Sequence, residues 1–198
     1  MEAGMKIGVL ALQGAFREHC WMLERCGVTA VEIRKPEELD DVAGLVIPGG
    51  ESTTIGKLML QWGLMEKIKA RQSQGMAIYG TCAGMIMLAK EIVGSDQPRL
   101  GLMDVAVRRN AFGRQRESFE AAMVVPEFGE KPVQAVFIRA PYIDQASDKV
   151  KIIAKVNDKI VIARQGKMLV TAFHPELTND DRIHKYFISM INEPEDIK

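Results

Sequence analysis

The stretch QGMAIYGTCAGMIMLAKEI, residues 74–92, decides the fold that this sequence predicts. An apolar run, Met76–Tyr79, leads into the pentapeptide GTCAG (residues 80–84), and a second apolar run follows at once. This order predicts a buried strand over Met76–Tyr79 that turns sharply into a buried helix over Ala83–Glu91. A core cysteine needs no glycines beside it, whereas a nucleophile held on a tight turn does.

The chain before this stretch alternates strand-like and helix-like segments. Short apolar runs predict buried strands, and apolar residues at helical spacing predict amphipathic helices. The expected strands are Met5–Leu12, Thr29–Pro36 and Ala43–Ile47, and the expected helices are Ala15–Gly27 and Thr53–Arg71, the latter broken near Gly63. Strands that alternate with helices in this way form a mostly parallel sheet with helices on both faces.

The second half of the chain has a different pattern. From about Gly94 onward, short β-type segments follow one another with turn residues between them, which predicts antiparallel strands. A last helix is expected over Asp180–Ile191, with Thr178 and Asn179 as candidate caps. We therefore predict an α/β fold, a three-layer mostly parallel sheet with flanking helices plus antiparallel strands, in a single domain over residues 1–198. The sequence leaves open whether residues 1–4 are an extension.

Composition excludes several classes of function. The formal net charge is +0 over 198 residues, which gives no sign of a nucleic-acid surface or a polybasic membrane patch. No apolar run approaches the roughly 20 residues that span a bilayer, and the N-terminus lacks the pattern of a signal peptide. Three cysteines, Cys20, Cys26 and Cys82, favour a reducing cytoplasm and match no zinc spacing. Cys20 and Cys26 are expected to be buried as small apolar side chains.

Cys82 is the candidate nucleophile. The pentapeptide has the shape G-x-C-x-G, the cysteine counterpart of the nucleophile elbow. At such a turn the cysteine takes a strained backbone conformation at a helix N-terminus, where the helix dipole favours the reactive thiolate. The next residue, Ala83, can offer its backbone N–H to an oxyanion. The alternative is a buried structural cysteine in a tight strand–helix turn.

His174 is the candidate base. It opens the tripeptide His174-Pro175-Glu176, in which Pro175 favours an extended backbone at His174. In extended geometry His174 and Glu176 project to the same side, so Glu176 can orient the imidazole. The alternative is a strand end with a solvated glutamate. His19 and His184 lie beside charged residues inside predicted helices and are expected at the surface or its boundary.

The segment VIPGGEST, residues 46–53, places two glycines at the carboxyl end of a predicted strand. Consecutive glycines let backbone N–H groups turn toward a ligand, and ligands bind at this edge of α/β sheets. We interpret Gly49-Gly50 as the second half of an oxyanion hole, with Ser52 or Thr53 capping the next helix. A phosphate-binding loop is the rival, but its glycine patterns are absent. A plain turn followed by an N-cap is the other alternative.

Together these residues resemble a known family. Cys82, then His174 and Glu176, after an earlier Gly-Gly loop, resemble the class I (triad) glutamine amidotransferases. The likeness narrows to the glutaminase subunits of the two-subunit pyridoxal 5′-phosphate synthases through the stretches LALQGAFREH, LVIPGGESTTIGKL, YGTCAGMIMLAKEI, RRNAFGRQRESFE, FIRAP and FHPELT. The resemblance covers nearly the whole chain from Met5 and implies a flavodoxin-like fold.

The resemblance implies a reaction and roles for individual residues. Cys82 would be the nucleophile, His174 the general base and then acid, and Glu176 the orienting carboxylate. L-Glutamine would be hydrolysed to L-glutamate and ammonia through a γ-glutamyl thioester, with no metal and no organic cofactor. The oxyanion hole would use Gly50 and Ala83. The other glutamine-binding positions would be Gly50, Glu51, Ser52, Arg109, Ile138 and Arg139, although composition alone leaves the two arginines as solvated strand residues.

The resemblance also implies a partner. Ammonium is not a nucleophile, so ammonia would pass through an internal path to a synthase subunit, in a cytoplasmic assembly of about 12 copies of each subunit. Glutaminase activity would be low until the synthase docks. Our hypothesis is that the Gly49-Gly50 loop is the switch.

Three other functions stay open at this point. The first is the glutaminase of another ammonia-using synthase, such as imidazole glycerol phosphate synthase, which shares the first half-reaction. The second is a hydrolase or chaperone of the stress-protein type, against which the His174–Glu176 pair argues. The third is a non-catalytic flavodoxin-like binding module, which leaves the cysteine, histidine and glutamate unexplained.

Overall fold

The computed structural model of the chain describes residues 4–110 and 118–194. The helices are α1 (Phe16–Arg25), α2 (Ser52–Gln61), α3 (Leu64–Ser73), α4 (Ala83–Leu88) and α5 (Arg182–Ile191), with short 3-10 helices η1 (Pro36–Asp41), η2 (Pro126–Phe128) and η3 (Pro175–Leu177). The strands are β1 (Lys6–Leu10), β2 (Thr29–Ile33), β3 (Gly44–Ile47), β4 (Ala77–Thr81), β5 (Ala89–Ile92), β6 (Met103–Arg108), β7 (Ser118–Met123), β8 (Val133–Ile138), β9 (Tyr142–Ala146), β10 (Lys151–Val156), β11 (Lys159–Gln165) and β12 (Met168–Thr171).

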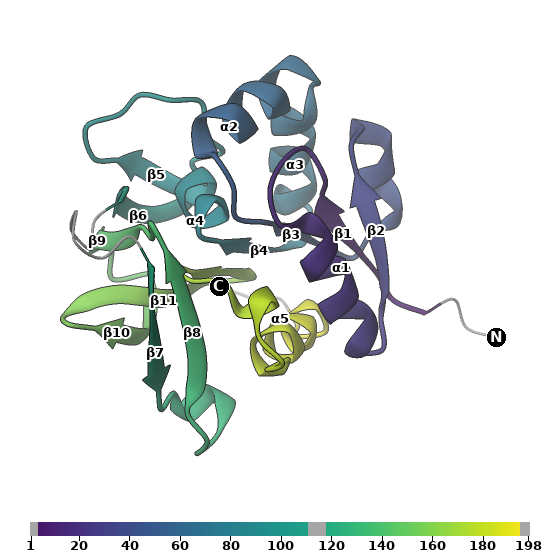
Figure 1. Cartoon of the computed structure of the whole chain (residues 1–198). Coiled ribbons are helices and arrows are strands. Elements are labelled where there is room, and N and C mark those ends of the chain that lie inside the picture. The colour runs from purple at the N-terminus through teal and green to yellow at the C-terminus, as the bar shows by residue number, and fades with distance from the viewer. Residues whose placement is uncertain (1–3, 111–117, 195–198) are drawn as a thin grey trace.

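A ten-stranded sheet forms the middle layer of the molecule (Figure 1). Its order is β2-β1-β3-β4-β12-β11-β9-β6-β5, and β10 pairs with β11 outside this path. The strands from β2 to β12 pair in parallel, whereas β11 and β9 continue the sheet in antiparallel pairs. The prediction of a mostly parallel first half followed by antiparallel strands is therefore confirmed.

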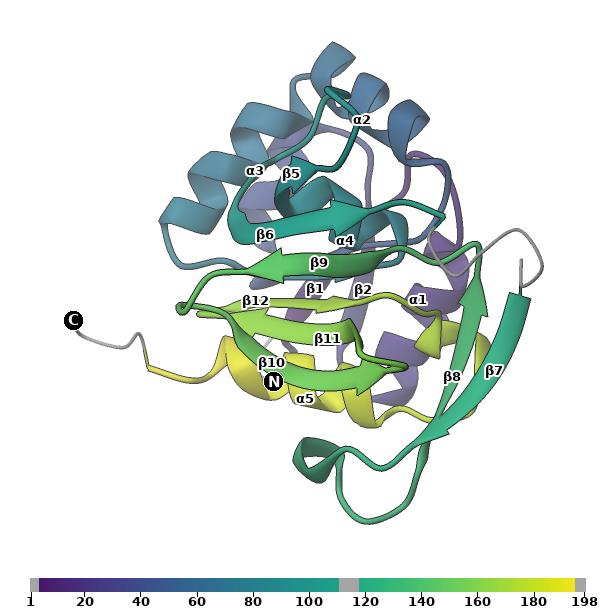
Figure 2. The ribbon, with the colours of Figure 1, turned by 90° about the vertical axis from the view of Figure 1, so that its left-hand side faces the viewer.

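Helices cover both faces of this sheet. Figure 2 shows α2 and α3 above the strands and α5 below them, and Figure 1 places α1 on the same side as α5. Every residue of β3 and β4 is buried as a result. Strands that are covered on both faces read as continuous apolar runs, which is why their sequence pattern predicted them correctly.

Strand β12 returns the end of the chain to the parallel part of the sheet. It runs parallel to β4, with Thr171 opposite Thr81. The carboxyl ends of the two strands therefore meet at one edge of the sheet, where ligands bind in α/β folds. Cys82 directly follows β4 and His174 follows β12 by three residues. The topology thus brings together two residues that lie far apart in the sequence.

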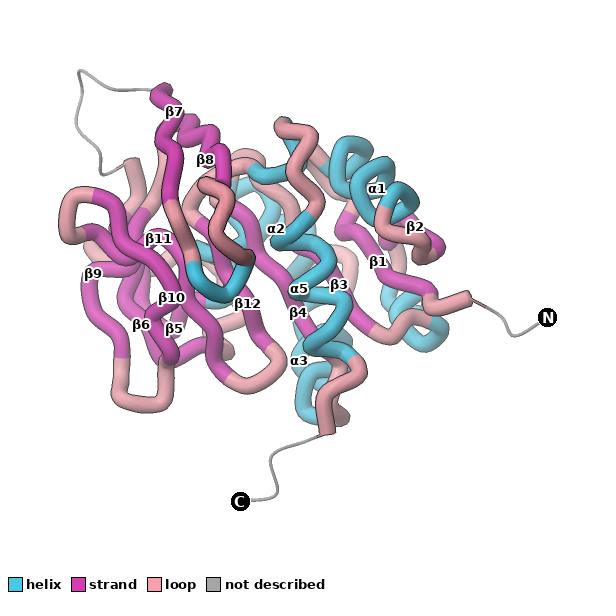
Figure 3. Tube along the Cα trace, turned by 90° about the horizontal axis from the view of Figure 1, so that it is seen from below, coloured by secondary structure: helices cyan, strands magenta, loops and turns pink. Residues whose placement is uncertain are grey.

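A two-stranded antiparallel ribbon, β7–β8, stands beside the main sheet (Figure 3). Its second strand touches the same edge, because the backbone N–H of His174 donates to the carbonyl of Val136 at 2.9 Å. Ile138, the last residue of β8, and Arg139 after it lie close to this contact. The ribbon therefore carries its end toward His174.

Several details differ from the sequence prediction. The helix after Cys82 ends at Leu88 rather than Glu91, because residues 89–92 pair with β6 as strand β5. The last helix begins at Arg182, and its first N–H is bonded to the Asp180 carboxylate at 3.1 Å. Cys20 and Cys26 are partly exposed rather than buried. The helix break at Gly63 is confirmed by its positive φ of 71°.

Within the described parts of the chain, no helix combines the length and apolar character that crossing a bilayer requires.

Candidate active site

The turn around Cys82 has the geometry that the sequence predicted. Cys82 is the N-cap of α4 and has a φ of 49°, a left-handed value that is strained for a non-glycine residue. A Cβ on Gly80 would lie under 3.0 Å from the backbone of Gly84, and one on Gly84 would meet the carbonyl of Ile47 equally closely. The glycines are therefore required by the close crossing of strand and helix. The N–H of Cys82 donates to the carbonyl of Thr171 at 2.8 Å, which ties the turn to β12.

His174 and Glu176 form the predicted pair, by a route that differs from the predicted one. His174 Nδ1 lies 2.7 Å from Glu176 Oε1. The backbone is not extended, because Pro175 begins the 3-10 helix η3 and His174 is its N-cap. The tight turn, rather than strand alternation, brings the two side chains together. With Nδ1 occupied by Glu176, Nε2 is the ring nitrogen that can serve a substrate or the thiol.

Electrostatics favour a charged pair at this position. Burial by itself lowers the pKa of His174, but interactions with the side chains of Cys82 and Glu176 outweigh it and raise the pKa to about 10. Burial would raise the pKa of Glu176, yet His19 and the hydrogen bond to His174 lower it below its ordinary value. An imidazolium beside a carboxylate is therefore the state that this environment stabilises at neutral pH.

The Gly49-Gly50 loop lies against His174. A Cβ on Gly49 would come within 3.0 Å of the His174 ring, and one on Gly50 would meet the side-chain oxygen of Gln13. The N–H of Ala15 donates to the carbonyl of Gly49 at 3.2 Å, and the N–H of Glu51 donates to Gln13 Oε1 at 2.7 Å. The segment before α1 therefore holds the conformation of this loop.

Glu51, and not Ser52 or Thr53, caps α2. Its carboxylate accepts the N–H groups of Thr53 at 3.1 Å and of Thr54 at 2.7 Å. Partial burial would raise its pKa, but hydrogen bonds from the threonines lower the pKa to about 2. A fixed negative charge thus sits at the mouth of the site.

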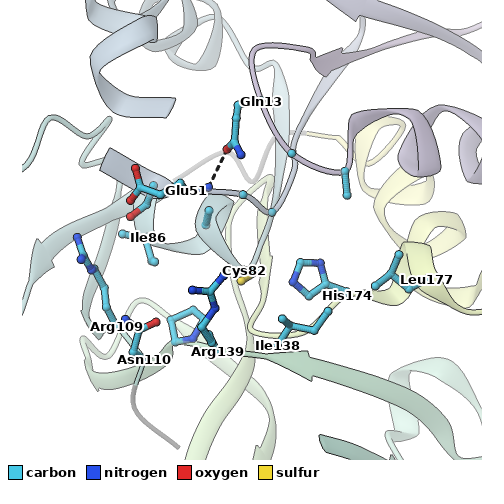
Figure 4. Close-up of a pocket in the computed structure, with 17 residues that line it drawn as sticks. Gln13, Glu51, Cys82, Ile86, Arg109, Asn110, Ile138, Arg139, His174 and Leu177 are labelled. Atoms are coloured by element: carbon cyan, nitrogen blue, oxygen red, sulfur yellow. Dashed lines mark hydrogen bonds between the residues drawn. The ribbon is translucent and has the colours of Figure 1, made fainter. Parts of the chain in front are cut away.

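These groups line one pocket of about 460 Å³, a common size for small-molecule sites (Figure 4). Figure 4 shows Cys82 flanked in this view by Arg139 and His174, with Gln13 and Glu51 across the pocket. All predicted site residues except Glu176, which lies behind His174, contribute to its wall: Gly50, Glu51, Ser52, Cys82, Ala83, Arg109, Ile138, Arg139 and His174.

The predicted glutamine-binding arginines reach the pocket from different elements. Arg109 follows β6 and donates to Gln97 Oε1, which also accepts from the hydroxyls of Ser52 at 3.4 Å and Thr53 at 3.3 Å. Arg139 follows β8 and has a φ of 42°. Of the family-like stretch RRNAFGRQRESFE, residues 111–117 lie outside the described residues.

Comparison with known proteins identifies the family. A model of the SNO glutamine amidotransferase family matches residues 9–193. The chain belongs to this family. It is 61% identical over 184 residues to "Pyridoxal 5′-phosphate synthase subunit PdxT" of Pelotomaculum thermopropionicum, covering 93% of this chain and 94% of that protein. It is 62% identical to the protein of the same name in Desulforamulus reducens, covering 94% and 100%. A solved structure described as a crystal structure of glutamine amidotransferase is 50% identical, with a TM-score of 0.90 over 94% of this chain and 99% of that one.

In this member of the SNO glutamine amidotransferase family, the prediction for two histidines is wrong. His19 and His184 are fully buried and not at the surface. The charged neighbours of His19 suggested exposure, but His19 lies on the same face of α1 as Met22 and Leu23, which pack into the core. The helical spacing of these three residues was the signal that could have shown it.

Two glutamines near the site were also missed. Gln13 lines the pocket and binds the Glu51 N–H, and Gln97 holds Arg109. Both lie in loops that have no periodic pattern. The sequence offered no signal for either residue.

Proposed function

We propose that the chain hydrolyses L-glutamine to L-glutamate and ammonia, and supplies the ammonia to a synthase subunit that makes pyridoxal 5′-phosphate. The observation that carries the chemical half is the position of Cys82 on a strained elbow, in the same pocket as His174 with Glu176 bonded behind it. Membership of a glutamine amidotransferase family supports the substrate. The names of the relatives favour pyridoxal 5′-phosphate synthase over imidazole glycerol phosphate synthase as the ammonia user.

The first step is acylation of Cys82. Its thiolate attacks the side-chain amide carbon of glutamine and forms a tetrahedral intermediate, with the negative charge on the amide oxygen. The backbone N–H groups of Gly50 and Ala83 would donate to that oxygen. Ala83 is suited to this because it is the first residue of α4, and the first N–H groups of a helix lack partners within the helix.

Departure of ammonia follows from the charge state of His174. The imidazolium gives its Nε2 proton to the amide nitrogen, the carbon–nitrogen bond breaks, and ammonia leaves behind a γ-glutamyl thioester. The raised pKa of His174, about 10, keeps this proton available at neutral pH. Glu176 holds the ring by Nδ1 throughout.

Hydrolysis of the thioester completes the cycle. The now neutral His174 takes a proton from water, the hydroxide attacks the thioester carbon, and the carbon–sulfur bond breaks. Glutamate leaves, and the thiolate–imidazolium pair is restored. The half-reaction requires neither a metal nor an organic cofactor.

The pocket wall suits a zwitterionic amino acid. Arg109 and Arg139 would bind the α-carboxylate, and the Glu51 carboxylate would bind the α-ammonium group. Ser52 and the backbone around Gly50 and Ile138 would fix the side-chain amide.

The partner would receive ammonia without release to water. We place the complex in the cytoplasm, in line with three free cysteines, as an assembly of about 12 copies of each subunit. The Gly49-Gly50 loop would be its switch. The bond from Ala15 N–H to the Gly49 carbonyl must break for that peptide to turn over, so docking that moves the segment before α1 would change the oxyanion hole.

The test is glutamate release from glutamine by the full chain, with and without the synthase subunit. Activity that rises with the synthase and is absent in Cys82→Ala supports both the triad and the partnership. Full activity without the synthase contradicts the switch but keeps the glutaminase. No activity in an intact complex contradicts the proposed function.

A further inference from the structure

Two buried imidazoles lie directly behind the catalytic pocket. His19 on α1 and His184 on α5 are both 0% exposed, and neither lines the pocket that contains Cys82. His19 Nδ1 is 2.9 Å from His184 Nε2. Polar groups are costly to bury unless they are hydrogen-bonded. We therefore looked for the partners of both rings and for an effect of the pair on the neighbouring triad.

His19 connects this pair to the triad. Its Nε2 lies 3.4 Å from Glu176 Oε2 and 3.0 Å from the hydroxyl of Thr81, the residue before the nucleophile. The other oxygen of Glu176 binds His174. In the described part of the chain, Glu176 Oε2 is buried and makes no regular hydrogen bond, so the His19 ring at 3.4 Å is a longer polar contact. Polar contacts therefore lead from His184 through His19 to Glu176, and a hydrogen bond leads on from Glu176 to His174.

The environment of His184 Nδ1 determines which ring nitrogens of His184 and His19 carry protons. In the described part of the chain, His184 Nδ1 is buried without a hydrogen-bond partner. Burial lowers the pKa of both His19 and His184, although Glu176 opposes this at His19, so both rings are neutral. A proton on His184 Nδ1 would be an orphaned buried N–H, which is rare and costly. The proton of His184 is therefore on Nε2 and points to His19 Nδ1, which leaves the proton of His19 on Nε2, toward Thr81 and Glu176.

We propose that His19 is a positioning residue for the triad, which holds the second oxygen of the Glu176 carboxylate, and that His184 sets the tautomer of His19. The inference rests on the proposed function, because it assigns His19 a role through Glu176 and His174. Neither histidine touches substrate.

Loss of this N–H has a definite consequence. Glu176 Oε2, which makes no regular hydrogen bond, would also lose the N–H that lies 3.4 Å away. The buried carboxylate would then be held less firmly against His174 Nδ1, and His174 would give up its proton at lower pH. His174 itself is faced by Cys82 and Glu176. The titratable and hydroxyl groups around His19 are Glu18 on its own helix, Tyr79 and Thr81 on β4, His174 and Glu176 at η3, and His184 on α5.

Two polar substitutions test separately the contact of His19 Nδ1 with His184 and the contact of His19 Nε2 with Glu176. In His19→Gln the amide nitrogen can reach the place of Nε2 and keep a donor toward Glu176. In His19→Asn the shorter amide reaches only the place of Nδ1, so the donor toward Glu176 is lost. Leu23→Ala is the matched control, because Leu23 is buried on the same helix and has no polar contact with these histidines or Glu176.

The experiment measures kcat, KM and the pH profile of glutamate release for the full chain in complex with its synthase. His19→Asn is expected to lower kcat by about 10- to 100-fold with little change in KM, as loss of a supporting hydrogen-bond partner does elsewhere. The alkaline limb of its kcat/KM profile moves to lower pH. His19→Gln is expected to keep most of the activity and the alkaline pH dependence of the wild type. Leu23→Ala is expected to lower thermal stability and to leave the alkaline pH dependence of kcat/KM unchanged.

A second readout needs no glutamine. Labelling of Cys82 by iodoacetamide, followed on its own peptide by mass spectrometry, reports the thiolate in the isolated chain. It is expected to slow at neutral pH in His19→Asn and not in His19→Gln. Asn, Gln and Leu23→Ala variants that all keep the wild-type pH limb and labelling rate would overturn the inference. A wild-type complex without glutaminase activity would instead end the proposed function, and the labelling comparison would still decide the role of His19.

Discussion

The chain leaves the adjacent strands β3 and β4 through two glycine turns that are held in different ways. At the elbow, the glycines face backbone: Gly80 crosses Gly84, and Gly84 meets the carbonyl of Ile47. At the Gly49-Gly50 loop, the glycines face the His174 ring and the Gln13 side chain. Backbone in a sheet cannot yield, whereas side chains can. The fold itself therefore fixes Cys82, the proposed nucleophile, whereas movable side chains surround Gly49-Gly50, the proposed oxyanion loop, so we expect regulation at that loop.

The largest effect is expected at the fixed turn. Cys82→Ala removes the proposed nucleophile, and glutamate release should fall by about 10⁴- to 10⁶-fold, as for other covalent triads. The variant should bind the synthase and glutamine normally, which sedimentation and calorimetry can check. Activity of Cys82→Ala close to wild type would move the chemistry away from the elbow altogether.

A methyl group at the elbow should disturb the whole fold. Gly84→Ala places a Cβ against the Ile47 carbonyl, and overpacking of this kind costs about 1–3 kcal/mol or more in the free energy of unfolding. Gly50→Ala meets the ends of two side chains, Gln13 and Ile55, which can shift, and should therefore cost much less. Urea denaturation of both variants measures the difference. Equal destabilisation would erase the contrast between the two turns.

A methyl group on the loop should disturb chemistry more than stability. Gly49→Ala pushes against the His174 ring, and a shift of about 1 Å in a catalytic group can lower activity about 100-fold. Glutamate release with the synthase present is the measurement, and the melting temperature is its control. A variant with normal kcat would show that His174 tolerates the contact, and that the loop is looser than we describe.

The support of Arg109 should have a smaller effect that is confined to binding. Gln97→Leu removes the acceptor that Arg109, Ser52 and Thr53 share. We expect KM for glutamine to rise about 10-fold with kcat nearly unchanged, because one charge-assisted hydrogen bond is loosened and the reacting groups stay in place. Gln72→Leu at a half-buried position of α3, away from the pocket, is a matched control. A fall in kcat alone would argue that Arg109 acts on the reacting amide rather than on substrate binding.

The pH dependence of stability should be gradual. The pKa of His174 is raised from 6.5 to about 10 in the folded chain. The protonated imidazole therefore contributes fully to the free energy of unfolding below about pH 6.5, and this contribution is lost as pH rises toward 10. Relative to His174→Gln, the free energy of unfolding of the wild type should therefore decline over this range. A constant difference between the two proteins from pH 6 to 10, measured by urea denaturation, would contradict a charged His174.

Local patterns predicted the fold better than they predicted the site's supporting residues. The buried strands β3 and β4, the elbow and the Gly63 break each depend on a few neighbouring residues, and the sequence shows them directly. The return of β12 beside β4 depends on pairing across 90 residues, and no local pattern encodes its place. The spacing of residues gave no reason to place Arg109 and Arg139 at the pocket, and only the resemblance to the family led us to expect them there.

The missed histidines illustrate the same limit. Arg17 and Glu18 made the segment around His19 look solvated, and only the packing of α1 and α5 brings His19 and His184 together behind Glu176. The Glu51 cap was misassigned for a related reason. Glu51, Ser52 and Thr53 follow one another, and spacing alone allows any of them to be the N-cap of α2. The hydrogen bonds from the N–H groups of Thr53 and Thr54 to the Glu51 carboxylate identify Glu51 as the cap.

The most direct test of the account is detection of the covalent intermediate. The complex with its synthase is mixed with glutamine, quenched in acid within a turnover, and digested for mass spectrometry of the three cysteine-containing peptides. We predict a γ-glutamyl adduct on Cys82 that is absent from Cys20 and Cys26 and from a Cys82→Ser variant. Rapid glutamate release without any adduct on Cys82, or with the adduct on another cysteine, would contradict the central claim that the elbow carries the nucleophile.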